Sequence, residues 1–556
     1  MKNNSNKVRN SVRRCKKSRQ AQILSTSHSE ASIADWESYF QLCHLFIIIL
    51  LYILYRITFT VVLILLYYVT TRKFNYWKKK KVSYAKPLPF FGNYIEWILH
   101  RKFTSKITQE LCRRFPDQPY FGTYFGMEPA LIIQDPDLLK LVMTKDFYYF
   151  NSRELMDYTT KEVITQNLFF NFGDKWKIVR QGLTPIFSTA KMKSMFHLIK
   201  KCAHAFEDML DHETERANVF DSKILMARYT MDCICSCAFG IDVKTMDKNS
   251  KDNPFLAMGE LIFSKSLLRG YALIWRAMWP KTFYGLGLKA FPTQIDQFFR
   301  TILIDVFNKR NYEPSKRNDF VDLMLGLKQN KCIVSDSISN LKTGDSKKVK
   351  LEVTDDLLVS QCVVFFAAGF ETSADALCLT LFELAKNQEA QLQAQKEVDE
   401  FLKRHKNDVD YDCVTELPYL RACISETLRL YPVLPVLSRE VVEDYVLPSG
   451  LRLERGMRVH IPVYHLHHHP GYFPRPEEYL PERFLPAAPH PVRPYTFMPF
   501  GEGPRTCIGM RFSKMQVIPG LITFLKKFHL TLAEGTPETF RGRHRHSFNT
   551  RVLFGK

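Results

Sequence analysis

Apolar residues recur every three to four positions over much of the chain between residues 95 and 430, a spacing that predicts helices. The clearest helical segments are 183–210, 221–240, 295–310, 355–387, 417–430 and, near the end, Met510–Lys527. Strand-like segments are short: Tyr120–Gly126, Ala130–Gln134, Val446–Leu453 and Arg458–Pro462. The pattern therefore predicts a mainly α protein with small β-sheets.

Two stretches lack a regular pattern. Residues 329–353 are polar and rich in Ser and Lys, which predicts an exposed connection. Proline is dense from 470 to 504, which predicts a long ordered loop.

One apolar run is much longer than the others. From Leu45 to Val69 only Arg56, Thr58 and Thr60 are polar. These residues would span about 37 Å as a helix, whereas an endoplasmic-reticulum bilayer requires about 27 Å. A buried core helix is rarely this long and this apolar on every side, so the run predicts a transmembrane anchor.

The basic charge of the chain is concentrated around this run and at the C-terminus. Residues 1–36, 72–86 and 541–556 carry +6, +7 and +5 of the formal net charge of +21. A nucleic-acid-binding protein would place such charge on its folded domain, so we expect no nucleic-acid partner. Basic flanks on both sides leave the orientation of the anchor open.

The first 29 residues contain no Asp or Glu and are rich in Ser and Arg. This composition also suits a mitochondrial transit peptide, although such peptides do not normally lead into an uninterrupted membrane span. We divide the chain into a basic polar tail (1–44), a transmembrane anchor (45–69), a basic linker with a proline hinge (70–94) and a catalytic domain (95–556).

The thirteen cysteines form no paired framework, which fits a reducing, cytosol-facing compartment. The alternating Cys233, Cys235 and Cys237 are interpreted as small residues of a buried helix. A histidine cluster at His465 and 467–469 is interpreted as loop or surface histidines, with a metal site as the less favoured alternative.

The segment FGEGPRTCIG (Phe500–Gly509) carries the strongest chemical signal. Gly503 and Gly509 bracket Cys507 and permit a tight backbone approach. A helix is expected to follow, and its free N–H groups would stabilise a thiolate. Arg505 adds a positive charge, so the segment suits a sulfur ligand to a metal centre.

This segment resembles the haem-ligand motif of the cytochrome P-450 family, F-x-x-G-x-R-x-C-x-G. The resemblance extends from about Lys86 to at least Lys527 and implies the P-450 fold. It also implies haem b as cofactor, with Cys507 as the axial ligand of its iron.

Three further motifs follow the same family. In AAGFETS (Ala367–Ser373) a glycine inside a helix and the back-bonding Thr372 suggest a bend. The resemblance implies that this bend leaves room for dioxygen and that Glu371 and Thr372 supply protons.

In ETLR (Glu426–Arg429) an i, i+3 Glu–Arg pair has apolar flanks, which favours burial. The family completes the pair with the arginine of PERF, here Arg483, in a structural role. In WKIVR, Trp176 and Arg180 would bind haem propionates, together with Arg505 and Arg439.

Residues 145–153 and 183–196 look most like the insect microsomal branch that handles xenobiotics and plant toxins. The proline hinge is thin, with only Pro87 and Pro89. The tail Arg541–Lys556 is short and basic where the family has a hairpin that reaches the substrate pocket.

The resemblance therefore implies a single-pass, endoplasmic-reticulum monooxygenase that faces the cytosol. Its partners would be NADPH–cytochrome P-450 reductase, cytochrome b5, the membrane, dioxygen and an apolar substrate. A basic face of Lys175, Lys177, Arg511 and Lys514 would dock the reductase. The alternatives are a mitochondrial ferredoxin-dependent monooxygenase and a haem isomerase or carrier. The expected substrate pocket is apolar and includes Leu168–Phe170, residues 256–290, Phe365, Phe366, Phe370 and Val433–Leu437.

Overall fold

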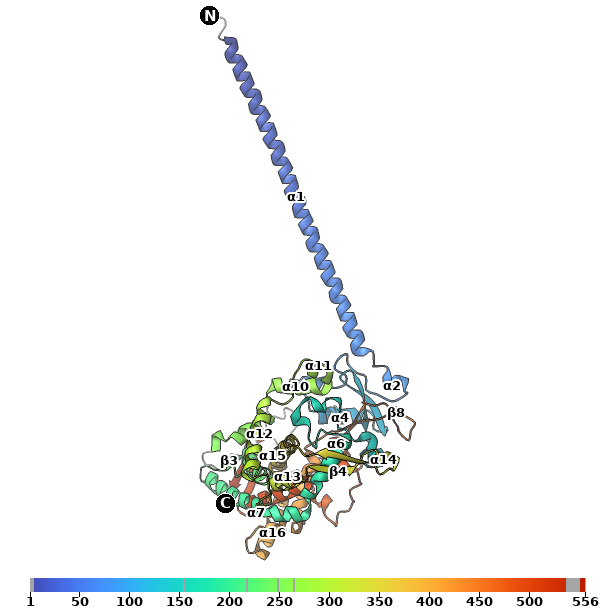
Figure 1. Ribbon diagram of the computed structural model, residues 1–556, viewed down its shortest axis with the longest axis vertical. Coiled ribbons are helices and arrows are strands. Elements are labelled where there is room, and N and C mark those ends of the chain that lie inside the picture. Colours follow the sequence, from blue (N-terminus) through green and yellow to red (C-terminus); the bar gives the residue numbers. More distant parts are fainter. Residues whose placement is uncertain are drawn as a thin grey trace. The chain divides into compact units, whose positions relative to one another are not determined.

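The computed structural model of the chain describes residues 5–153, 156–216, 219–247, 250–263, 266–536 and 551–555. The chain divides into two compact units, Met1–Arg72 and Lys73–Lys556. The first unit consists of one continuous helix, α1 (Ser5–Thr71), visible in Figure 1. Its part Ser38–Thr71 is long and apolar enough to cross a membrane, and its side chains from Ser38 to Val69 are all exposed.

The second unit is mainly helical. Its longer helices are α4 (Thr104–Arg113), α6 (Gly173–Leu183), α7 (Thr189–Arg216), α8 (Ser222–Ala238), α9 (Pro254–Ile262), α10 (Leu267–Met278), α12 (Thr293–Lys309), α13 (Phe320–Gln329), α15 (Asp355–Lys386), α16 (Gln388–Arg404), α18 (Pro418–Leu430) and α20 (Met510–Leu525). Its shorter helices are α2 (Tyr76–Lys79), α3 (Ile95–Ile98), α5 (Pro136–Lys140), α11 (Pro280–Gly285), α14 (Asn340–Thr343), α17 (Cys413–Glu416) and α19 (Val463–His467). The predicted fold class is confirmed.

Helix α15 forms the centre of the second unit, where it packs against α8, α12, α18 and α20 (Figure 1). It begins at Thr354, whose hydroxyl accepts a hydrogen bond of 3.2 Å from the N–H of Leu357. Asp355 and Asp356 occupy its first turn, where their negative charges interact favourably with the positive end of the helix dipole. Although α15 is also long and apolar enough to span a membrane, most of its apolar stretch is buried in this core.

The main sheet has the strand order β1 (Tyr120–Phe125), β2 (Glu128–Ile133), β9 (Arg458–Ile461) and β6 (Leu437–Glu440). The β2–β9 pair is parallel, and the other two pairs are antiparallel. The predicted strand Val446–Leu453 is instead a small hairpin of β7 (Tyr445–Val446) and β8 (Arg452–Leu453).

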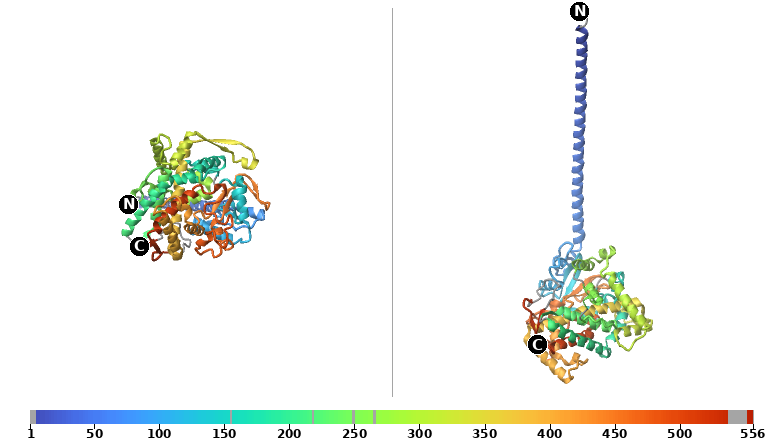
Figure 2. Two further views of the ribbon diagram at one scale, coloured as in Figure 1. Left: turned by 90° about the horizontal axis from the view of Figure 1, so that it is seen from below. Right: turned by 90° about the vertical axis from the view of Figure 1, so that its left-hand side faces the viewer.

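Residues 329–353 contain a second hairpin where the sequence predicted an exposed connection. Strands β4 (Cys332–Asp336) and β5 (Lys348–Glu352) pair antiparallel and extend at the edge of the unit, drawn in yellow in Figure 2. Ile333 packs beside Gly182 of α6, while Lys348 and Lys350 are exposed. In the sequence, these lysines alternate with the inward-facing apolar residues of β5, so the segment looked polar and the short strand was not recognised.

The basic C-terminal tail also contributes a strand. Strand β11 (Arg551–Gly555) lies between β10 (His529–Leu532) and β3 (Val219–Asp221), antiparallel to both. Residues 537–550 and 556, which hold most of the predicted basic tail, lie outside the described residues.

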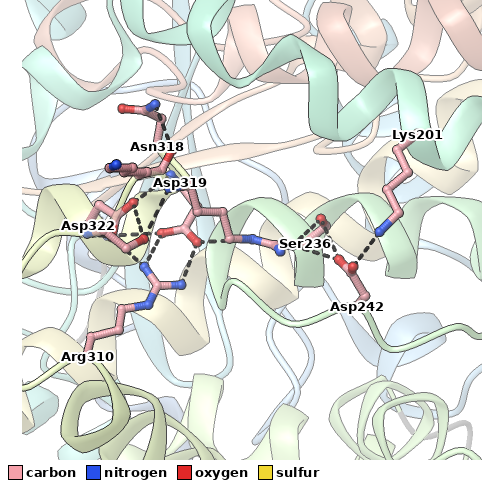
Figure 3. Close-up of polar contacts among 10 residues, drawn as sticks. Lys201, Ser236, Asp242, Arg310, Asn318, Asp319 and Asp322 are labelled. Atoms are coloured by element: carbon pink, nitrogen blue, oxygen red, sulfur yellow. Dashed lines mark hydrogen bonds and ion pairs between the residues drawn. The ribbon is translucent and has the colours of Figure 1, made fainter.

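A buried charge cluster joins the ends of α12 and α13 to the loop after α8, as Figure 3 shows. Arg310 donates to Asp319 at 2.7 Å and to Asp322 at 2.5 Å, and Asp319 is fully buried. Gly240 lies against this pair with a φ of +65°, and a Cβ there would come within 2.4 Å of the Asp319 carboxylate. Glycine at this position is therefore required by both backbone conformation and space.

Candidate active site

The loop Phe500–Gly509 precedes α20 and is held in a tight turn. The N–H of Cys507 donates to the carbonyl of Phe500 at 2.8 Å, and the N–H of Thr506 donates to that of Gly503 at 2.9 Å. Gly503 has a φ of +70°, and a Cβ there would come within 2.0 Å of the carbonyl oxygen of Met143. Only glycine fits this close backbone approach.

The thiol of Cys507 is accessible and yet desolvated. Its side chain is exposed, yet surrounding protein raises the pKa of the thiol through desolvation. The N–H of Gly509 and the charges of Arg153 and Arg180 lower this pKa in part. A thiol that is both accessible and desolvated can ionise readily only when a positively charged group or a metal centre stabilises the thiolate.

Arginine side chains gather around this thiol. Arg505 lies over the ring of Trp176 at 4.6 Å and donates to the backbone carbonyls of Asn151, Phe169 and Asn171. Burial, and to a smaller extent the charge of Arg153, lowers the pKa of Arg439 to about 9. Burial also lowers the pKa of Arg180 and that of Arg505.

In the part of the chain that the structure describes, no ion pair joins Arg180, Arg439 or Arg505 to a carboxylate. The Nε of Arg439 is buried and has no hydrogen-bond partner among the described residues. Buried guanidinium groups are usually paired, because an unpaired charge is costly to desolvate. The cluster therefore fits an anionic ligand that carries carboxylate groups.

Arg153 belongs to this cluster and was not recognised in the sequence. Its guanidinium lies over the ring of Phe169 at 4.1 Å and donates to the carbonyl of Arg505 at 3.3 Å. Its charge acts on Cys507, Arg439 and Arg505 alike. Arg153 is more than 350 positions away from Cys507 in the sequence, so only the fold reveals this proximity.

In the middle of α15, residues 367–369 are more exposed than the residues on either side, and we call them the exposed stretch. Ala368 is exposed although Phe366 and Phe370 on either side are buried. The hydroxyl of Thr372 bonds back to the carbonyl of Ala368 at this stretch. A Cβ on Gly369 would come within 2.6 Å of Ile234 of α8, so the glycine allows the two helices to approach closely.

The two residues of the predicted proton pair have different neighbours. The Glu371 carboxylate forms an ion pair of 3.0 Å with Lys223 of α8, whereas Thr372 bonds to its own helix. Lys223 also pairs with Asp375 at 2.5 Å. Glu371 and Thr372 are adjacent in sequence, but their side chains bind different partners and not each other.

Glu426 and Arg429 of α18 are fully buried and joined by two hydrogen bonds of 2.7 and 2.8 Å. Arg483, in the 3₁₀ turn Pro481–Phe484, donates to Glu426 at 3.3 Å. The remaining donors of Arg429 bind the backbone carbonyls of His467, Pro476 and Glu478. The pair is therefore fully hydrogen-bonded, as a buried ion pair must be to be tolerated.

His467 connects this pair to the Cys507 loop. Its carbonyl accepts from Arg429 at 2.9 Å, and its ring Nε2 accepts from the N–H of Met498 at 2.9 Å. Burial lowers the pKa of His467 to about 3, so the ring is neutral and can accept. The carbonyl of Met498 then accepts from the N–H of Gly501 in the loop.

The sequence interpretation of the histidine cluster as loop or surface residues is wrong for His467, which lies in α19 and is buried, whereas His468 follows in a buried turn. His467 is fully buried, and His468 is 4% exposed. They were missed because their burial depends on contacts with segments distant in sequence. Within the described residues no group of three His, Cys, Asp or Glu side chains could hold a metal ion. The expected burial of Cys233, Cys235 and Cys237 is confirmed.

Comparison with known proteins identifies the family of this chain. The family model of cytochrome P450 matches residues 82–550, which is most of the chain. The chain belongs to the cytochrome P450 family. It is 35% identical over 478 residues to cytochrome P450 6B2 of Helicoverpa armigera, covering 86% of this chain and 92% of that protein.

Other relatives from insects are similar to the same degree. Cytochrome P450 6j1 of Blattella germanica is 34% identical over 481 residues, covering 86% of this chain and 92% of that protein. Cytochrome P450 6a2 of Drosophila melanogaster is 34% identical over 484 residues, covering 85% and 92%. The predicted family and its insect branch are confirmed. This P450 is a haem-thiolate monooxygenase and thus an oxidoreductase.

Proposed function

We propose that Cys507 is the axial ligand of haem b in an NADPH-dependent monooxygenase of the endoplasmic-reticulum membrane. The observation that carries this proposal is the pair Arg439 and Arg505, which are buried and form no ion pair among the described residues, beside an accessible, desolvated thiol. Haem with a thiolate ligand activates dioxygen, so that one oxygen atom enters the substrate and the other becomes water.

The arginine cluster would hold the two propionates of the haem. Arg180, Arg439 and Arg505 each offer a guanidinium group that pairs with carboxylates in a fork. Trp176, whose ring is covered by Arg505, would add a contact from α6. We add Arg153 to this set, because its charge lowers the pKa of Arg505, as those of Arg439 and Arg180 do. Phe500, Gly503 and Gly509 would shape the loop that presents the thiolate.

Thr372 and Glu371 would deliver protons. The hydroxyl of Thr372 lies at the exposed stretch of α15, where it can hold a water at its Oγ1 atom. Glu371 would supply protons from the α8 side after leaving its ion pair with Lys223. Glu426, Arg429 and Arg483 would serve a structural role, since their contacts reach the Cys507 loop through His467.

The substrate is proposed to be an apolar small molecule, either a xenobiotic or an endogenous lipophile. Phe370 lies beside the exposed stretch of α15 and contacts Phe263 with 6.2 Å between ring centroids. Phe365 packs against Phe187, and Phe366 packs against Phe239 and Phe370. Of these three expected pocket residues, Phe370 therefore has the strongest support.

A basic surface near the Cys507 loop suits an acidic redox partner. Arg511 and Arg421 are exposed, and both lower the pKa of Lys514, after the larger effect of burial. These like charges form no ion pair among the described residues, which favours an acidic flavoprotein such as NADPH–cytochrome P-450 reductase, or cytochrome b5. Lys175 and Lys177 instead bond to Gln166 and to the carbonyl of Ser337, so they contribute less.

Two separate features support membrane association. The apolar, fully exposed part of α1 can act as the anchor. In the second unit, exposed apolar side chains gather on α10, α11 and the segments beside them: Phe263, Leu267, Leu268, Leu273, Trp275, Leu286 and Leu288. Such a patch is large for a water-exposed surface and suits contact with lipid.

The proposal can be tested with the full-length chain in insect-cell microsomes. With added reductase, NADPH and a panel of lipophilic substrates, we expect NADPH-dependent products, and added protease should digest residues 72–556. Turnover only with a ferredoxin system, or a shortened N-terminus in mitochondria, would favour the mitochondrial alternative. Product formation without NADPH, or haem binding without any turnover, would favour an isomerase or a carrier.

A further inference from the structure

The other two members of the histidine cluster line a small pocket. His465 lies in α19, and His469 follows four positions later, in the turn after that helix. Both residues are partly exposed, and their rings contact each other with 5.5 Å between centroids. The pocket has a volume of about 190 Å³, and both histidines form part of its wall. The fold thus presents two imidazole rings to one space.

The rest of the pocket wall is rich in hydrogen-bond acceptors. Asp117 comes from the segment before β1, and Gln134 and Asp135 follow the end of β2. Among the described residues that line the pocket there is no lysine or arginine. The charge of Arg113 reaches His465 from outside the wall, but two carboxylates offset it. These groups favour a positively charged ligand.

Gln134 leaves one acceptor unpaired at this pocket. The residue is 7% exposed, and its Nε2 donates to the carbonyls of Phe115 and Gln118 at 2.7 and 2.6 Å. These two bonds fix the orientation of the amide, because the reversed amide would set its oxygen against both carbonyls. Its Oε1 is buried and has no hydrogen-bond partner among the described residues. A buried acceptor requires a donor, which a hydrated ligand in the pocket would supply.

We propose that His465 and His469 bind a zinc ion through their ring nitrogens. Two histidines four positions apart are a recurrent zinc-binding pair. Imidazole nitrogen suits zinc, whereas magnesium and calcium prefer oxygen ligands. Since no group of three His, Cys, Asp or Glu side chains in the described part of the chain could hold a metal ion, water fills the other positions. These waters would donate to the carboxylates and to Gln134.

Binding requires little rearrangement of the two histidines. The His465 ring makes no hydrogen bond to the described residues, so its nitrogens are available. Nδ1 of His469 accepts an exposed bond of 3.2 Å from the N–H of Gly471. Zinc at Nε2 places the proton on Nδ1, so this bond is given up, and a long, exposed hydrogen bond contributes little.

The ion would stabilise the part of the fold that supports the Cys507 loop. His467 lies between the two ligands in sequence, and its ring accepts from the N–H of Met498. Zinc would therefore tie α19 to the ends of β1 and β2 without contact with the reacting atoms. This inference does not depend on the proposed function.

The test is isothermal titration calorimetry of Zn²⁺ into the haem-loaded, full-length chain after treatment with a chelator. We expect micromolar binding that weakens about tenfold or more in His465→Gln and in His469→Gln. Zinc should also raise the thermal unfolding midpoint of the parent but not that of either variant. Mg²⁺ at the same concentrations should not bind to this pair.

His197→Gln is the matched control. His197 is an exposed histidine of α7 whose ring bonds to the carbonyl of Ser194 at 2.9 Å, and its loss should leave zinc binding unchanged. If His465→Gln does not fold, as judged by its haem spectrum, His469→Gln decides. Zinc affinity equal to the parent's in a folded variant would place the metal elsewhere and overturn the site. Equal binding of Mg²⁺ and Zn²⁺ would overturn the role of the imidazoles.

Discussion

Lys223 of α8 holds Glu371 of α15, with 3.0 Å between Nζ and Oε1. The same Nζ lies 2.5 Å from Asp375, one helical turn further along α15. The lysine side chain is 16% exposed and those of Glu371 and Asp375 about a quarter exposed, so the three charges are only partly screened. Lys223 therefore neutralises two carboxylates that would otherwise repel each other.

Lys223→Met should destabilise the folded protein by about 1–2 kcal/mol, less than for a fully buried pair. Burial alone would lower the pKa of Lys223, but Asp375 and Glu371 outweigh it and the pKa is raised. The stabilisation is thus fully present below the ordinary lysine pKa and is lost only as pH rises through the higher folded value. Chemical denaturation should give the same difference at about pH 7 and about pH 9. A difference that shrinks over this interval would contradict the raised pKa.

Thr372→Ala should uncouple the reaction. Alanine preserves the helix but removes the hydroxyl proposed to hold a proton-delivering water. Haem content and substrate binding should persist, while product per NADPH falls and peroxide rises. The control is Thr380→Ala, because Thr380 makes the same back-bond, to Ala376 at 2.7 Å, in the buried part of the helix. Equal coupling in the two variants would reduce Thr372 to a helix-bending residue.

Arg429→Leu should yield little folded, haem-loaded protein. It leaves the Glu426 carboxylate buried without its main partner and removes donors from three carbonyls, at a cost of about 3–5 kcal/mol. Arg475→Leu disrupts an exposed i, i+3 pair with Glu478 and should cost less than about 1 kcal/mol. Haem incorporation and thermal unfolding would be measured in both. A stable, haem-loaded Arg429→Leu would show that the buried pair is dispensable.

Asp319→Asn should destabilise the cluster drawn in Figure 3 by about 3 kcal/mol, because Arg310 would lose a buried charge partner. The control is Asp305→Asn, which affects an exposed pair with Lys309 and should cost about 0.5 kcal/mol. Urea denaturation measures both free energies. Equal effects would mean that water screens the Arg310 cluster as effectively as the surface pair.

Local motifs carried most of what the sequence could predict. The Cys507 loop and the Glu426–Arg429 pair lie within ten consecutive residues each, so their spacing is visible without a fold. Helices such as α8 and α15 were found because their apolar faces repeat over many turns. The roles assigned to these site residues remain predictions.

Contacts between distant segments were not predictable in this way. Arg153 joins the arginine cluster, and Lys223 pairs with Glu371, only after the chain has folded. Strands β4 and β5 were missed because every second residue of β5 is charged and exposed. The contacts of His467 likewise depend on partners from other elements.

The carbon-monoxide difference spectrum of Cys507→Ala tests the central claim most directly. The reduced parent protein should show the long-wavelength Soret band of a thiolate-ligated haem, because a thiolate donates electron density to the iron. Cys507→Ala should lose this band. Cys332→Ala, which alters a partly exposed cysteine of β4, should keep it. A Cys507→Ala protein that retains the band would contradict the assignment of Cys507 as the haem ligand.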